Sequence, residues 1–187
     1  MTVKGKIRII GGRYRGRKIS VVHEEIRPTS DRVRETLFNW LNPKLVNKSC
    51  LDLFAGTGIL GIEALSRGAR KVVFVDHQQD IISEIKNQVT TLQLKNTSVI
   101  FSDSLSYLEN PKHLDSFDII FLDPPFGAYS LEKLLEHIDK TKSLNPQGMV
   151  YYESSQPLEN KMISNSWDNY RESNAGNVLW ASYKKNT

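Results

Sequence analysis

Short apolar runs alternate along the chain with longer segments whose apolar residues recur at helical spacing, and this alternation begins at Cys50. The apolar runs predict strands, and the segments between them predict helices. The predicted strands are 50–55, 71–76, 98–103, 117–123 and 148–153, and the predicted helices are 58–67, 78–93 and 130–140. Runs of five or six apolar residues are typical of strands buried on both faces. Their alternation with helices indicates an α/β fold, with a mostly parallel sheet and helices on both faces.

The C-terminal part of the chain has a different pattern. Residues 167–173 and 177–184 predict two strands with only an Asn-Ala-Gly turn between them, which indicates an antiparallel hairpin at one sheet edge. We therefore expect a main domain over residues 29–187, preceded by a small extension over residues 1–28.

The N-terminal extension is predicted to be a β-hairpin. Residues 6–10 and 17–22 predict strands, and the segment GGRYRG between them predicts a turn. A helix over 31–41 follows, with Ser30 or Asp31 as its N-cap.

Composition adds limits on the class of protein. The 187 residues are 39% hydrophobic and 25% charged, and no stretch approaches the ~20 apolar residues of a membrane span. The single cysteine, Cys50, allows no intramolecular disulfide and no Cys-based zinc site. The four histidines lack metal-ligand spacing, so we expect no metal. These features and the absence of a secretory signal favour a cytoplasmic protein.

Charge is concentrated at the N-terminal end. Residues 1–34 carry ten basic side chains against three acidic ones, a net charge of +7, whereas the whole chain carries +4 and the remainder therefore −3. A basic end on a slightly acidic body indicates a polyanionic partner that binds at that end.

A glycine-rich loop follows the first predicted strand of the main domain. Its sequence, Gly56-Thr57-Gly58-Ile59-Leu60-Gly61, matches G-x-G-x-x-G, and Asp76 ends the next strand 18 residues after Gly58. Such glycines let the backbone approach a nucleotide, and such a carboxylate can bind ribose hydroxyls. Asp52, just before the loop, would repel a pyrophosphate but suits the cationic methionine part of S-adenosylmethionine. The alternative for Asp52 is a carboxylate that caps the loop.

A third acidic residue, Asp103, ends the third predicted strand, with Ser104 beside it. The carboxylate could accept a hydrogen bond from an adenine amino group. An N-cap for a helix that starts near residue 104 is an equally good interpretation.

The fourth predicted strand runs directly into Asp123-Pro124-Pro125-Phe126. Two prolines remove N–H donors, so this turn offers carbonyl oxygens together with the Asp123 carboxylate. An exocyclic amine with two N–H donors could dock there with its lone pair oriented for transfer. Phe126 offers a face on which a base can stack. The alternative is an ordinary turn after a strand.

The turn of the N-terminal hairpin is both basic and aromatic. Arg13, Arg15, Arg17 and Lys18 surround Tyr14 between glycines, so a flexible turn could contact phosphates and stack on an unpaired base. A solvated hairpin with no such partner is the alternative.

Three more arginines flank the start of the predicted helix. Arg27, Arg32 and Arg34 could bind phosphate, or could form exposed ion pairs with Asp31 and Glu35.

These motifs together resemble a known family. The segments LDLFAGTGILGIEALSRGA, VFVD and DPPF are similar to the motifs of class I methyltransferases that act on amino groups. The segments RIIGGRYRGRKI, RPTSDRVRETLFNWL and VYYES resemble the bacterial RsmD family, which methylates the N2 amino group of one guanine in 16S ribosomal RNA. The resemblance covers nearly the whole chain and implies a Rossmann-like, seven-stranded methyltransferase domain with a C-terminal antiparallel hairpin and an added N-terminal hairpin.

The resemblance also implies ligands and site residues. The implied cofactor is S-adenosylmethionine, and the implied partner of a monomeric enzyme is 16S ribosomal RNA, free or within a small-subunit particle. The implied reaction residues are Asp123, Pro124, Pro125 and Phe126. The expected cofactor residues are Asp52, Phe54, Ala55, Gly56, Thr57, Gly58, Asp76, His77, Asp103 and Ser104. The expected RNA contacts are Arg8, Arg13, Tyr14, Arg15, Arg17, Lys18, Arg27, Arg32 and Arg34.

Other functions remain open on the residues alone. A DNA adenine-N6 methyltransferase would use the same Asp-Pro-Pro-aromatic turn, although the chain leaves little room for a target-recognition region. An NAD-dependent oxidoreductase would use the same glycine loop. A catalytically silent RNA-binding module is the third alternative.

Overall fold

The computed structural model describes residues 5–21, 29–42, 44–110, 115–125, 128–154, 166–175 and 178–185. The helices and strands in these residues are, in chain order, β1 (Gly5–Arg8), β2 (Lys18–Val21), α1 (Asp31–Leu41), β3 (Ser49–Asp52), α2 (Ile59–Ser66), β4 (Lys71–Asp76), α3 (Gln79–Thr91), β5 (Thr97–Phe101), α4 (Ser104–Glu109), β6 (Phe117–Leu122), α5 (Leu131–Thr141), β7 (Leu144–Ser154), β8 (Trp167–Ala175) and β9 (Val178–Lys185).

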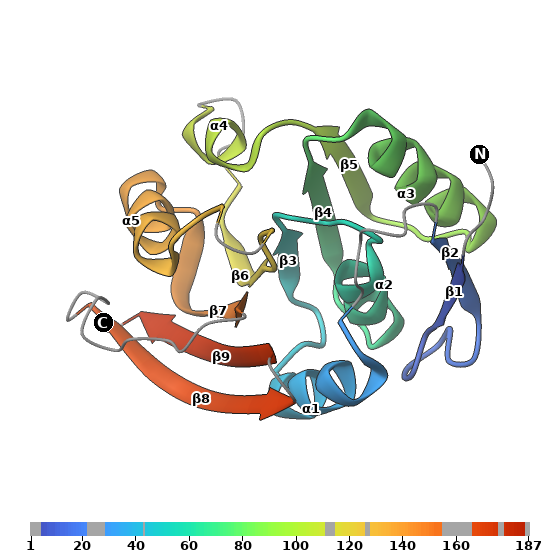
Figure 1. Ribbon diagram of the computed structural model, residues 1–187, viewed down its shortest axis with the longest axis horizontal. Coiled ribbons are helices and arrows are strands. Elements are labelled where there is room, and N and C mark those ends of the chain that lie inside the picture. The colour runs from blue at the N-terminus through green and yellow to red at the C-terminus, as the bar shows by residue number, and fades with distance from the viewer. Residues whose placement is uncertain are drawn as a thin grey trace.

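The main sheet has seven strands in the order β5-β4-β3-β6-β7-β9-β8 (Figure 1). The first five strands of this order are parallel to one another, whereas β9 is antiparallel to both β7 and β8. The predicted α/β class, the mostly parallel sheet and the C-terminal antiparallel hairpin are therefore confirmed. Because β3, β4, β5, β6 and β7 run the same way, their carboxyl ends all lie at one edge of the sheet.

Strand β7 differs most from its prediction. It begins at Leu144 rather than at residue 148, and its pairing with β6 shifts along its length. Phe117 lies opposite Leu144, whereas Ile119 lies opposite Met149, so the segment Asn-Pro-Gln-Gly lies within an irregular stretch of the strand. Proline removes a backbone N–H donor from a strand, so the sequence pattern does not indicate a strand that crosses Pro146.

The N-terminal hairpin forms as predicted and packs against α2. Strands β1 and β2 are antiparallel. Beyond β1, the backbone N–H groups of Ile10 and Gly11 donate to the buried Glu63 carboxylate at 3.0 and 2.7 Å. The hairpin therefore has no core separate from that of the main domain. The division at residue 28 stays a prediction, because residues 22–28 lie outside the described part of the chain.

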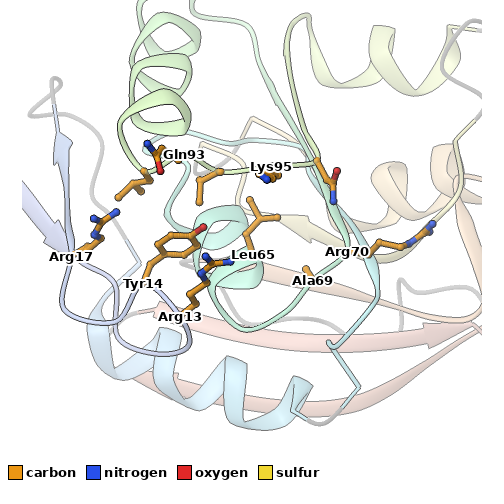
Figure 2. Close-up of a pocket in the computed structure, with 11 residues that line it drawn as sticks. Arg13, Tyr14, Arg17, Leu65, Ala69, Arg70, Gln93 and Lys95 are labelled. Atoms are coloured by element: carbon orange, nitrogen blue, oxygen red, sulfur yellow. The ribbon is translucent and has the colours of Figure 1, made fainter.

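The turn of this hairpin is anchored at the end of α2 and is less free than its glycines suggested. The backbone N–H groups of Arg13 and Tyr14 donate to the carbonyl and hydroxyl oxygens of Ser66, at 2.7 and 2.9 Å. Gly12 has φ +74°, and an added Cβ would lie 1.9 Å from the Ser66 carbonyl oxygen. Figure 2 shows Arg13 and Tyr14 beside Leu65 of the same helix. Only glycine fits so close to the helix end.

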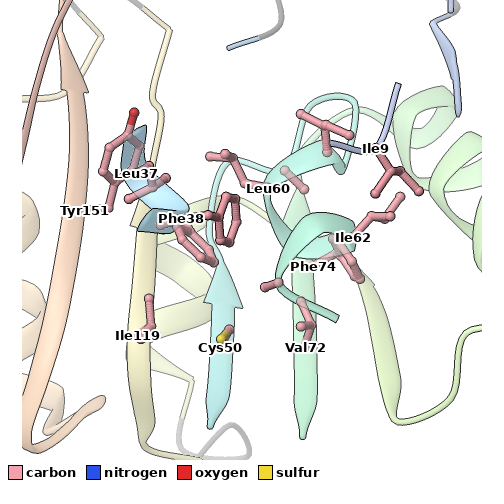
Figure 3. Close-up of a cluster of buried hydrophobic side chains, with 14 of the residues drawn as sticks. Ile9, Leu37, Phe38, Cys50, Leu60, Ile62, Val72, Phe74, Ile119 and Tyr151 are labelled. Atoms are coloured by element: carbon pink, nitrogen blue, oxygen red, sulfur yellow. The ribbon is translucent and has the colours of Figure 1, made fainter. Parts of the chain in front are cut away.

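Successive strand residues alternate between two hydrophobic clusters. Cys50, Val72 and Phe74 face the cluster that holds α1, α2, α3 and the N-terminal hairpin, whereas Leu51 and Val73 face α4 and α5. Figure 3 shows the first cluster, in which the helices and the hairpin pack on the same face of the sheet. None of the described helices has the length and apolar character needed to span a membrane.

Candidate functional site

Acidic side chains gather at the carboxyl edge of the sheet. Asp52 ends β3, Asp76 ends β4, and Asp123 follows β6. Glu153 lies one residue before the end of β7, opposite Trp180 of β9. The sequence predicted the first three at this edge, and the parallel strands bring them together as expected. Glu153 was not predicted as a site residue; it is part of the segment VYYES, which carries the family resemblance.

Asp76 fixes the conformation of the glycine loop through two hydrogen bonds. One carboxylate oxygen of Asp76 accepts from the N–H of Gly56 at 3.0 Å, and the other accepts from the N–H of Gln78 at 2.9 Å. Gly56 and Gly58 have φ values of 49° and 74°, in the left-handed region that favours glycine. Asp76 thus shapes the loop, and each oxygen keeps a further lone pair for a ligand.

The third glycine of the motif brings helix and sheet together. A Cβ on Gly61 would lie 2.3 Å from the ring of Phe74, so α2 could not approach β4 with any larger residue there. The N–H of Gly61 donates to Asp52 at 3.0 Å. Asp52 therefore accepts an N–H group of the first turn of α2, whereas the alternative interpretation of the sequence had it capping the loop.

Burial changes the acidity of Asp52. The side chain is 1% exposed. Burial raises its pKa to about 7; the N–H of Gly61 opposes this change, and the charge of Asp76 adds to it. A cationic ligand at this edge would favour the ionised form, whereas a pyrophosphate would not.

Asp103 adopts the alternative that the sequence left open. It is the N-cap of α4, where its carboxylate accepts from the N–H of Ser106 at 3.0 Å, and this bond lowers its pKa. Its second oxygen accepts from the hydroxyl of Tyr129 at 3.0 Å, and the Tyr129 ring lies 5.1 Å from that of Phe54. Ser104 is buried and donates to the carbonyl of Leu53.

The remaining expected cofactor residues lie around the loop. Ala55 and Thr57 are buried, and the Thr57 hydroxyl accepts from the N–H of Ile59 at 3.4 Å. His77 is exposed, with its ring 3.7 Å from Asp76.

Asp123 belongs to a hydrogen-bonded cluster that joins three distant segments. The Thr29 hydroxyl lies 3.4 Å from a carboxylate oxygen of Asp123 and 3.2 Å from one of Glu153. Its single proton can be donated to only one of them at a time. The Tyr151 hydroxyl donates to the same Glu153 oxygen at 3.1 Å. Thr29, Tyr151 and Glu153 are all buried.

The cluster makes Asp123 a weaker acid than an exposed aspartate. Burial raises its pKa well above the ordinary value, the charges of Glu153 and Asp52 raise it further, and the Thr29 hydroxyl partly opposes them. The buried Asp52 and Glu153 and the half-buried Asp123 form a site rich in hydrogen-bond acceptors, suited to a ligand with N–H donors or positive charge.

The two prolines after Asp123 differ in exposure and form part of a turn. Pro124 is buried and Pro125 is exposed, and the carbonyl of Pro125 accepts from the N–H of Ala128 at 3.0 Å. Phe126, predicted to stack on a base, lies outside the described residues.

Most of the expected RNA contacts reach solvent. Arg13, Arg15, Arg17 and Lys18 are exposed at the hairpin turn, Arg32 is exposed on α1, and Arg8 is 63% exposed beside Asp31 at 3.7 Å. Tyr14 is partly buried. Arg27 lies outside the described residues.

Arg34 does not fit its predicted role. It is 0% exposed and makes hydrogen bonds to the Arg8 and Thr29 carbonyls, to Asp31 and to Glu63. A guanidinium enclosed in this way cannot reach an RNA phosphate, so we remove Arg34 from the expected contacts. It holds the hairpin and the start of α1 in place.

Sequence reasoning missed four residues at this edge: Thr29, Tyr129, Tyr151 and Glu153. Three of them lie within the segments RPTS and VYYES, which were quoted only for their resemblance. A polar residue such as Glu153 in an otherwise apolar strand was the available signal, because buried carboxylates are rare without a role.

Comparison with known proteins identifies the family. A family model described as "Conserved hypothetical protein 95" matches residues 7–184. The chain belongs to this family. It is 39% identical over 186 residues to "Ribosomal RNA small subunit methyltransferase D" of Haemophilus influenzae, with 97% of this chain and 95% of the relative covered. The resemblance to the RsmD family is thereby confirmed.

Solved structures agree with this family assignment. The methyltransferase candidate yhhF of Escherichia coli is 38% identical, with a TM-score of 0.86 over 97% of this chain and 98% of the other. The 16S rRNA N2 G1207 methyltransferase RsmC of Thermus thermophilus, in complex with AdoMet and guanosine, is only 19% identical and has a TM-score of 0.67 over 97% of this chain and 50% of the other. That last likeness concerns the fold alone. Membership of a methyltransferase family favours methyl transfer over the NAD-dependent alternative.

Proposed function

We propose that the protein transfers a methyl group from S-adenosylmethionine to the exocyclic N2 amino group of a guanine in small-subunit ribosomal RNA. Ribosomal RNA as the substrate class follows the names of the relatives that match nearly the whole chain. The observation that carries the chemistry is the position of Asp123 at the same sheet edge as Asp52 and the glycine loop.

The residues at this edge fit the cofactor. The left-handed glycines allow close approach of the backbone, and Asp76 stands at the end of the neighbouring strand for the ribose hydroxyls. Asp52 offers a buried carboxylate for the positively charged methionine part. Asp103 follows β5, the strand next to β4, and Tyr129 reaches it from the connection between β6 and α5. We place the adenine on this side of the site. S-adenosylmethionine supplies a methyl group bonded to a positively charged sulfur.

The chain's own residues act on the amine. The Asp123 carboxylate and the Pro124 carbonyl oxygen accept its two N–H groups, which directs the nitrogen lone pair toward the cofactor side of the edge. Thr29 and Glu153 fix the Asp123 carboxylate in place. The amine nitrogen would form a bond to the methyl carbon while the bond from that carbon to sulfur breaks and its electron pair stays on sulfur, which becomes neutral. The nitrogen also loses one proton, which passes to Asp123 or to water.

Asp123→Ala tests this assignment. With labelled S-adenosylmethionine and small ribosomal particles from cells that lack the gene, transfer should fall by at least ~100-fold, because the amine is no longer oriented. Cofactor binding should stay nearly unchanged. Asp115→Ala is the matched control, since Asp115 is an exposed carboxylate at the opposite end of the same strand region.

The labelled product decides the target. Label on guanine N2 supports the proposal, whereas label on a ring nitrogen, on protein or on adenine N6 of DNA overturns it. Loss of cofactor binding in Asp123→Ala would show that the division of roles between Asp123 and the glycine loop is wrong.

A further inference from the structure

A basic groove lies at the edge of the sheet opposite the proposed reaction site. It encloses about 730 Å³ between three segments: the hairpin turn, the connection from α2 to β4, and the connection from α3 to β5. Its polar lining includes Arg13, Tyr14, Arg17, Arg70, Gln93 and Lys95 (Figure 2). Because both connections lead from a helix into the start of a strand, the groove is at the amino edge.

The cations of this groove have no carboxylate partner within the described part of the chain, although the Arg13 guanidinium lies 5.7 Å from the centre of the Tyr14 ring. Arg13, Arg17, Arg70 and Lys95 are exposed, no acidic residue lines the groove, and no described carboxylate lies within 4 Å of these four cations. Other cations of this edge differ, because Lys48 pairs with Asp118 and Lys71 with Asp115. A groove with four such cations is complementary to a polyanion.

The groove is built on a fixed frame. Ser66 accepts the N–H groups of Arg13 and Tyr14 and donates to the carbonyl of Gly11, so the turn is fastened to the end of α2. The buried Leu92 and Leu94 form part of the lining from the other side. The cations are therefore held by ordered backbone on both walls, which lowers the conformational entropy lost when a ligand binds.

The position of the groove restricts which part of an RNA could bind. The turn contacts the end of α2, whereas Asp52 and the glycine loop lie at its start. A phosphate in the groove would therefore lie at the opposite end of α2 from a nucleotide at the reaction site.

We propose that this groove binds the phosphate backbone of a ribosomal RNA segment separate from the one that carries the methylated base. The inference rests on the proposed function for the identity of the polyanion, and it adds Arg70 and Lys95, from the main domain, to the hairpin residues. Gln93 adds an amide that can bond to sugar or base.

The competing explanation is structural. Arg70 and Lys95 follow the C-terminal ends of α2 and α3, where positive charge offsets the helix dipole. This explanation predicts lower thermal stability on removal of the two charges, with no change in RNA affinity.

The test is a double variant, Arg70→Ala with Lys95→Ala, on the full chain. Lys86→Ala with Lys133→Ala is the matched control, because it removes two exposed helical cations away from the groove. The probe is a transcript of small-subunit ribosomal RNA, and binding is measured across a salt series. The slope of log affinity against log salt should become shallower by about 1.4–1.8 in the groove variant, from the loss of two phosphate contacts. KM for the transcript should rise at unchanged kcat.

Three outcomes would overturn the proposal: an unchanged salt slope, an equal change in the control variant, or lower thermal stability alone. A shortened RNA that keeps only the methylated loop gives a further check. It should bind the groove variant and the unaltered protein equally well, and a difference there would place the groove at the target segment. Because RNA binding is read without methyl transfer, a wrong target base would leave this test intact.

Discussion

The buried carboxylate of Glu63 is the point at which the N-terminal hairpin depends most on a single side chain. It accepts the N–H groups of Ile10 and Gly11, and it contacts Arg67 at 3.0 Å and the fully buried Arg34 at 3.5 Å. Glu63→Ala would leave both amides and a buried guanidinium without this partner. Removal of one member of a buried ion pair costs about 3–5 kcal/mol of unfolding free energy.

This cost should be measurable as a melting temperature. For a chain of this length, 1 kcal/mol corresponds to about 2–4 °C, so Glu63→Ala should lower Tm by about 6–20 °C. Glu136→Ala, an exposed glutamate on α5, is the control and should change stability by less than ~0.5 kcal/mol. Urea denaturation gives the free energies, and hydrogen exchange shows whether the hairpin amides lose protection first. A loss below ~1 kcal/mol in Glu63→Ala would refute the reasoning, because the cluster would then be replaceable by water.

Three further predictions concern the site and the turn. Cofactor binding should tighten as pH rises through about 7, because a cationic ligand favours ionised Asp52. Asp52→Asn should bind the cofactor more weakly, and its affinity should not change across this pH range. Calorimetry on either side of pH 7 measures both affinities. Gly12→Ala should cost more than ~1 kcal/mol and weaken RNA binding in a filter assay, since its Cβ meets Ser66, while cofactor binding stays intact. Glu153→Gln should lower the pKa of Asp123 by removing a neighbouring charge, which would move the acid limb of the kcat–pH profile to lower pH; an unmoved limb would contradict the coupling.

The sheet and half of the site could be predicted because their signals are local. Apolar runs mark the buried strands, and Asp52 and Asp76 stand at strand ends that a parallel sheet must bring to one edge. The start of β7 was missed because Pro146 interrupts the apolar pattern, although it lies in an irregular part of the strand.

The rest depends on contacts between residues far apart in the chain. Arg34 sits among charged residues of a helical pattern that reads as exposed, and its partner Glu63 is 29 residues away. The Thr29 hydroxyl meets Glu153 across 124 residues. No periodicity encodes such a pairing, since the same residue types occur more often on a solvated surface.

Helix α2 acts as a fixed spacer in this protein. Its first turn receives Asp52 beside the glycine loop, and its last residue, Ser66, seats the hairpin turn. Its eight residues correspond to about 12 Å, at 1.5 Å per residue. One inserted residue would move the two ends apart by about 1.5 Å and rotate one against the other by about 100°. Under the proposed RNA binding, the length of α2 therefore sets the distance between the nucleotide at the reaction site and the phosphates in the basic groove.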